Sequence, residues 1–107
     1  MFDEPTSSPN FALHQRIISG KSCHVPPADV KSAWRNQLHH RARTYFDGNR
    51  LLAAEYGHTG RLVEMIALDA GEHRDRLGNP LRVIYHANWA TRKFVQEIGL
   101  PTSMAEQ

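Results

Sequence analysis

The fold expected for this chain rests on the segment RLVEMIALDA, Arg61 to Ala70. It is apolar at both odd and even positions apart from Glu64, and such a run is typical of a strand covered on both faces. In this interpretation Glu64 shares a face with Leu62 and Ile66, where an unpaired carboxylate would be costly to bury. The segment is therefore predicted to form a central strand, with Glu64 paired, near an open end of the sheet, or facing solvent.

Strand-like segments lie on both sides of this central strand. The segments ARTYF and RLLAAEYG, residues 42–46 and 50–57, are separated by an Asp-Gly turn and predict a hairpin. The next turn is HTG, at residues 58–60. After the central strand, a charged loop at 71–80 leads to LRVIYHA at 81–87, which predicts a fourth strand. Short turns between consecutive strands favour an antiparallel sheet.

Helical patterns lie at both ends of the chain. Residues 10–19 predict a short helix, and residues 27–38 predict a longer one with a proline in its first turn and an apolar face that contains Trp34. A final helix is predicted to start at an Asn88 cap and to end before Gly99. Its apolar stripe is Thr91, Phe94, Val95 and Ile98.

These elements predict a single domain of class α+β. N-terminal helices pack on a four-stranded, mainly antiparallel sheet, and a C-terminal helix completes the fold. A chain of 107 residues suffices for one core. The domain is expected to span residues 10–100, between flexible termini at 1–9 and 101–107.

The composition narrows the functional classes. Hydrophobic residues make up 40% of the chain and charged residues 22%, as in soluble globular proteins. No apolar run reaches the roughly 18 residues of a membrane span, and the acidic start does not resemble a signal peptide, so we expect a cytoplasmic protein. Cys23-His24 and His39-His40 lack a second pair at zinc-site spacing, so neither a metal nor a cofactor is predicted. A pI near 9.0 is compatible with an anionic partner.

Two cations lie near the start of the final helix. Arg92 and Lys93 occupy the positive end of the helix dipole, where a cation costs about 0.3 to 1 kcal/mol. The free amides of a helix start favour anions, and an added guanidinium and ammonium would suit a phosphate. A solvated helix face is the alternative interpretation.

His86 and a group of residues around one turn are further candidates. His86 ends the fourth strand, and strict alternation places it on one face with Arg82 and Ile84. Histidine transfers protons near neutral pH, although a structural role at a strand end is the alternative. A second group of polar residues lies around the turn before the central strand: Tyr56, His58 and Arg61. The alternative interpretation of this group is an ordinary polar end of a hairpin.

The C-terminal half resembles a family of bacterial toxins. GHTGRLVEMIALDA, the charged loop after it and LRVIYHANWATRKF are similar to the BrnT group and, more distantly, to the RelE/ParE superfamily. The similarity covers roughly residues 25–95. It implies a RelE-like fold and the toxin role in a type II toxin–antitoxin pair. It also implies an endoribonuclease that cleaves mRNA, often on the ribosome, without a metal.

The resemblance also implies roles and partners. The expected catalytic residues are His86, Arg92, Arg61 and Glu64, and the expected RNA-binding residues are Lys93, Arg82, His58 and Tyr56. The expected partners are RNA and an antitoxin whose acidic segment covers the basic site. Two alternatives stay open. One is a non-enzymatic module that binds nucleic acid or protein through its basic face, and the other is a subunit anchored to a partner by a tryptophan.

Overall fold

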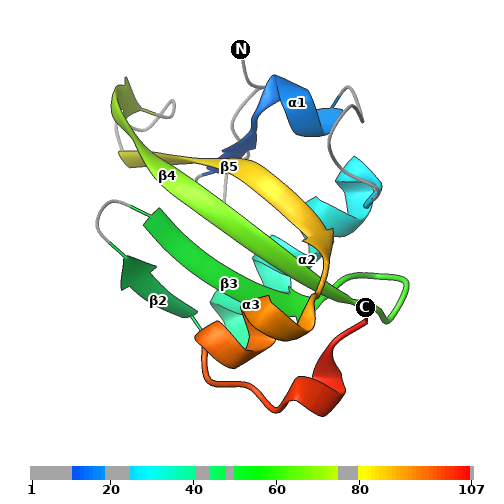
Figure 1. Ribbon diagram of the computed structural model, residues 1–107. Coiled ribbons are helices and arrows are strands. Elements are labelled where there is room, and N and C mark those ends of the chain that lie inside the picture. Colours follow the sequence, from blue (N-terminus) through cyan, green and yellow to red (C-terminus); the bar gives the residue numbers. More distant parts are fainter. Residues whose placement is uncertain (1–10, 19–24, 41–43, 48–49, 75–79, 107) are drawn as a thin grey trace.

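The computed structural model describes residues 11–18, 25–40, 44–47, 50–74 and 80–106, and all structural statements below concern these residues. The fold is α+β, as predicted in broad class (Figure 1). The elements, in chain order, are β1 (Phe11–Leu13), α1 (Gln15–Ile18), α2 (Pro27–His40), β2 (Thr44–Asp47), β3 (Arg50–Tyr56), β4 (Leu62–Arg74), β5 (Pro80–Trp89), α3 (Arg92–Glu97) and the 3-10 helix η1 (Thr102–Met104).

The sheet has five strands in the order β1-β5-β4-β3-β2, one more than predicted. Neighbours from β2 to β5 pair antiparallel, whereas β1 pairs parallel with β5, Phe11 opposite Arg82. The prediction of a short helix over residues 10–19 is confirmed only for Gln15–Ile18, the range of α1, because residues 11–13 are extended. The physical reason is the free edge of β5, whose backbone groups require partners that a short strand supplies.

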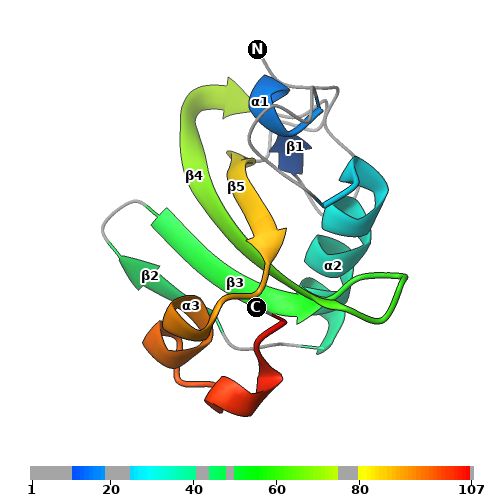
Figure 2. The same cartoon turned by 45° about the vertical axis from the view of Figure 1, so that its right-hand side comes forward.

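The β4–β5 hairpin is longer than predicted. Strand β4 continues to Arg74, and β5 begins at Pro80, the residue opposite it. Residues 71–74 and Pro80 of the predicted loop thus belong to strands, and residues 75–79 lie outside the described residues. Polar composition predicted a loop, but ladder hydrogen bonds need only the backbone. Figure 2 shows how strongly β4 curves along this length.

Helices pack on both sides of the sheet (Figures 1 and 2). Helix α2 covers one side, called the α2 side, and α3 with η1 covers part of the other, called the α3 side. The core on the α2 side includes Leu13, Val30, Ala33, Trp34, Ala53, Val63, Met65, Ala67, Ile84 and Ala87. The core on the α3 side is Leu52, Ala54, Leu62, Ala90, Phe94, Val95 and Ile98. None of the described helices is long and apolar enough to cross a membrane.

A β-bulge in β5 determines which side chains reach the α3 side. Ile66 pairs with His86 and the next β4 residue, Ala67, pairs with Ile84, so Tyr85 is an extra residue in β5. Ile84 belongs to the core on the α2 side, whereas His86 contacts Glu64 on the α3 side. The prediction that His86 shares a face with Ile84 is therefore wrong, because a bulge interrupts strict alternation.

The last helix and the C-terminal segment also differ from prediction. Strand β5 includes Asn88, which we expected as the helix cap, and Thr91 caps α3 instead. Beyond α3, Met104 packs against the core of the α3 side, and the Glu106 amide donates to the Ala90 carbonyl at 2.7 Å. These contacts attach Met104 and Glu106 to the domain, whereas the sequence predicted a flexible end at 101–107. The predicted flexible segment 1–9 lies outside the described residues.

Candidate functional site

The centre of the candidate site is the carboxylate of Glu64, in the middle strand of the sheet. Only 4% of Glu64 is exposed. Its Oε1 accepts hydrogen bonds from the Thr91 amide and the Thr91 hydroxyl, both at 2.8 Å. Its Oε2 lies 2.7 Å from Nε2 of His86. Of the three environments that the sequence left open for Glu64, the structure therefore has the paired one.

These contacts keep Glu64 ionised. Burial raises the pKa of this carboxyl, but the hydrogen bonds from His86 and from the amide and hydroxyl of Thr91 outweigh burial, so the pKa lies below its ordinary value. At neutral pH the site therefore holds a buried negative charge directly against the His86 ring.

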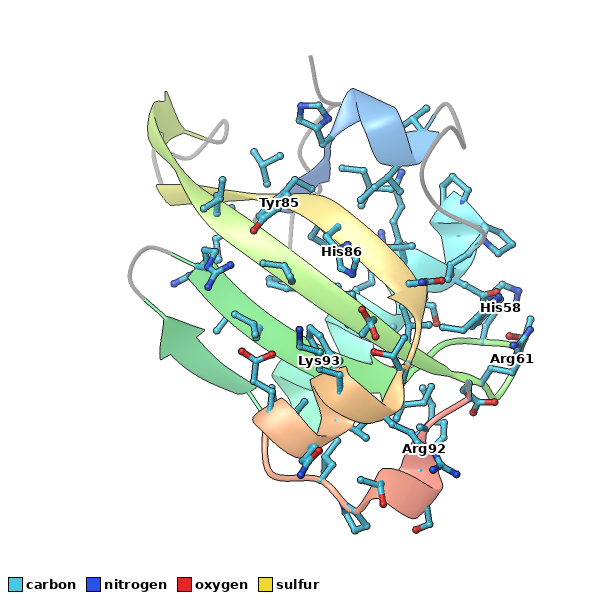
Figure 3. The ribbon with its side chains drawn as sticks, in the orientation of Figure 1. His58, Arg61, Tyr85, His86, Arg92 and Lys93 are labelled. Carbon is cyan, nitrogen blue, oxygen red and sulfur yellow. The ribbon has the colours of Figure 1, made fainter. Side chains whose placement is uncertain are left out.

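His86 lies on an uncovered part of the sheet. Its side chain is 35% exposed. Among the described elements, only α3 and η1 pack on the α3 side, and they leave a patch that we call the open face: Arg50, Ile66, Leu68, Tyr85 and His86. The pairs Arg50–Leu68 and Ile66–His86 are neighbours across strands. Leu68 is 38% exposed, a high value for a leucine within a sheet. Because the bulge turns Tyr85 to this side too, an aromatic ring and an imidazole stand next to each other there (Figure 3).

The two cations at the start of α3 point in different directions. Arg92 and Lys93 are the first two residues of the helix, and both are exposed. Figure 3 shows Lys93 on the side of α3 nearer to His86, and Arg92 on the side toward η1. The structure therefore brings Lys93, but not Arg92, toward His86. Helix α3 has only six residues, so we place no separate phosphate site at its amides.

Arg61 is held in the turn just before β4. Its guanidinium carbon lies 3.8 Å from the centre of the Trp89 ring, in a cation–π contact. Its Nε lies 3.8 Å from Oε1 of Glu106, whose Oε2 accepts a hydrogen bond from the Leu62 amide at 3.0 Å. Figure 3 shows Arg61 beside His58 and apart from His86. The structure does not bring this expected catalytic cation to the open face.

His58 belongs to the turn between β3 and β4. Its Nδ1 lies 2.8 Å from Oδ1 of Asp29, a carboxylate near the start of α2 that is 1% exposed. The amide and hydroxyl of Thr59 also donate to Asp29, each at 3.3 Å. A Cβ on Gly57 would lie 2.8 Å from the same Oδ1, so the turn needs glycine at this position. These contacts attach the turn to α2 and give His58 a structural role.

The remaining predicted residues lie apart from His86. Tyr56, at the end of β3, is exposed and pairs across the sheet with Leu62. Arg82 precedes Ile84 by two residues, so alternation places it on the α2 side, opposite to His86. His39 and His40 belong to α2, whereas Cys23 and His24 lie outside the described residues. Within the described part of the chain, no group of three His, Cys, Asp or Glu side chains is arranged to hold a metal.

Sequence reasoning missed two residues of the site. Thr91 was assigned to an apolar stripe, although a threonine before a helix is also an ordinary cap signal. Tyr85 carries no signal in the sequence, because only the pairing of β5 with β4 reveals the bulge. Neither a protein-family model, nor a curated protein, nor a solved structure matches this chain.

Proposed function

We propose that this protein is the toxin of a type II toxin–antitoxin pair with a RelE-like fold, and that it is an endoribonuclease that cleaves mRNA without a metal. The observation that supports cleavage best is the His86–Glu64 pair at 2.7 Å on the open face, with Lys93 on the same side. An imidazole backed by a buried carboxylate is suited to accept a proton, and an ammonium nearby is suited to hold a phosphate.

The reaction proposed for this site begins when His86 accepts the proton of the ribose 2′-hydroxyl. The 2′-oxygen bonds to phosphorus and the bond from phosphorus to the 5′-oxygen breaks, leaving a 2′,3′-cyclic phosphate. The 5′-oxygen takes a proton from solvent and His86 returns its proton to solvent, so the products balance. Glu64 stabilises the imidazolium that forms, and Lys93 stabilises charge on the phosphate.

Binding of the RNA rests on the open face. Tyr85 and Leu68 offer an aromatic and an aliphatic surface beside His86, and unpaired bases stack on such side chains. Arg50, opposite Leu68, adds a cation to the same face. The proposed substrate is therefore mRNA in the cytoplasm, free or on the ribosome. The proposed antitoxin places an acidic segment on this face and excludes the RNA.

Conditional expression tests the proposal. The wild-type chain is expected to arrest growth, and the purified protein to cleave RNA with cyclic-phosphate ends, whereas His86→Gln does neither. His58→Gln is the matched control, because His58 also contacts a buried carboxylate but lies at the β3–β4 turn. Equal cleavage by folded His86→Gln protein contradicts the proposal. Salt-sensitive RNA binding without cleavage by the wild-type protein would instead identify a non-enzymatic binding module.

A further inference from the structure

We infer that Thr91 is a positioning residue for His86: by anchoring Glu64 it keeps the imidazole proton on Nε2 and leaves Nδ1 as the nitrogen that accepts a proton from the substrate. The kinetic consequence rests on the proposed function. The assignment of the two ring nitrogens does not, because it follows from the contacts of three side chains.

The first step concerns the two oxygens of Glu64. Thr91 directs both its amide and its hydroxyl to Oε1, at 2.8 Å each, and this leaves Oε2 to His86 alone among the described residues. Two donors on one oxygen fix the plane of the carboxylate. With the carboxylate held in this way, its Oε2 lies 2.7 Å from Nε2 of the His86 ring.

The second step concerns the proton. An ionised carboxylate only accepts hydrogen bonds, so the ring nitrogen at 2.7 Å donates one. A neutral imidazole has one protonated nitrogen, so Nδ1 then carries a lone pair. When Nδ1 takes the 2′-hydroxyl proton, both nitrogens are protonated and the positive ring faces the negative Glu64. The other titratable groups on this side include Tyr85, Lys93, Arg50 and Tyr56.

The third step links the ring to the last helix. The Thr91 hydroxyl that donates to Glu64 also accepts a hydrogen bond from the Phe94 amide at 3.3 Å, and so caps α3. The Thr91 side chain therefore caps the helix that carries Lys93 and also anchors the carboxylate that orients His86. Thr91 thereby links the carboxylate that contacts His86 to the start of the helix that carries Lys93.

Nitrogen-15 NMR of the His86 ring tests the assignment without any substrate. In the wild-type protein at a pH where His86 is neutral, Nε2 is expected to be protonated and Nδ1 unprotonated. Thr91→Val should give a mixture of both tautomers, and Thr91→Ser, which keeps the hydroxyl, should restore the wild-type spectrum. Thr59→Val is the matched control, because the Thr59 hydroxyl also donates to a buried carboxylate, Asp29, far from His86.

Two outcomes overturn the inference: a wild-type ring protonated on Nδ1, or folded Thr91→Val protein whose ring stays wholly protonated on Nε2. In the cleavage assay, Thr91→Val is expected to be roughly tenfold slower and Thr91→Ser close to wild type. If His86→Gln cleaves normally while the NMR results hold, the proposed function fails and the positioning role stands.

Discussion

Glu64 and His86 meet diagonally across two strands. In the pairing of β4 with β5, Glu64 lies opposite Asn88 and His86 lies opposite Ile66, yet their side chains approach to 2.7 Å. The diagonal contact exists because the bulge at Tyr85 turns His86 to the side on which Glu64 lies. A carboxylate and a histidine separated by 21 positions of intervening sequence thereby become one unit at the edge of α3.

Removing the charge of Glu64 is expected to destabilise the fold. Glu64→Gln keeps the shape of the side chain but replaces one carboxylate oxygen by an NH2 group. This NH2 group is a donor, and it would face the donors of Thr91 or of His86. The expected loss is about 1 to 3 kcal/mol in the free energy of unfolding, measured by urea denaturation. Glu97→Gln, on the exposed face of α3, is the control and should change stability by less than about 0.5 kcal/mol. Equal stability of both variants would show that the buried contacts of Glu64 contribute nothing.

The same carboxylate should give the protein an acid-sensitive contribution to stability. The folded-state pKa of Glu64 is lowered, so its stabilising contribution is fully present above the unfolded pKa of about 4.3. The contribution is lost as the pH falls through the lower folded-state pKa. The difference in unfolding free energy between wild type and Glu64→Gln should therefore shrink below about pH 4. Urea titrations between neutral and acid pH measure it, and a difference independent of pH contradicts the assignment.

Lys93 and Arg92 should differ in their effect on RNA binding. Lys93 lies on the side of His86 and Arg92 on the side of η1, so Lys93→Gln should weaken binding more than Arg92→Gln. Fluorescence anisotropy with a single-stranded RNA over a range of salt measures both. Loss of one phosphate contact should reduce the salt slope by about 0.7 for Lys93→Gln. A larger effect of Arg92→Gln would place the RNA on the other side of α3.

Arg61 is expected to matter for stability and little for cleavage. Arg61→Gln removes the contact with the Trp89 ring and the ion pair with Glu106. A loss of about 0.5 to 1 kcal/mol is expected, with a change in tryptophan fluorescence that reports on Trp89. The cleavage rate per folded molecule should stay close to wild type. A large fall in that rate would return Arg61 to the catalytic role that the resemblance implies.

Gly57 offers a test of the β3–β4 turn. An alanine Cβ there would lie 2.8 Å from Asp29 Oδ1, too close without displacement of the buried carboxylate. Gly57→Ala should therefore destabilise the protein by about 1 to 3 kcal/mol in thermal or urea unfolding. Gly60→Ala is the comparison variant, because a Cβ there would meet nothing within 4 Å and only the φ of +83° opposes the change. The two variants together separate the effect of crowding from that of backbone strain.

Much of the broad architecture was accessible from the sequence because it depends on local patterns. The apolar run from Leu62 to Leu68 predicted a central strand, and β4 indeed lies in the middle of the sheet. Apolar residues at four-residue spacing predicted a helix over 27–38, and α2 spans Pro27–His40. The cost of burying an unpaired carboxylate predicted that Glu64, if buried, has partners. These inferences need only the periodicity of apolar residues and the free-energy cost of burying a charge.

The α+β class and the set of residues able to carry charge or protons therefore follow from local sequence patterns. Which of these residues meet depends on tertiary contacts. Strand β1 fills an edge that no local pattern reveals, and the bulge at Tyr85 reverses the alternation that would have put His86 beside Ile84. Long-range backbone pairing sets both features, and it also places Thr91 against Glu64 while holding Arg61 on Trp89.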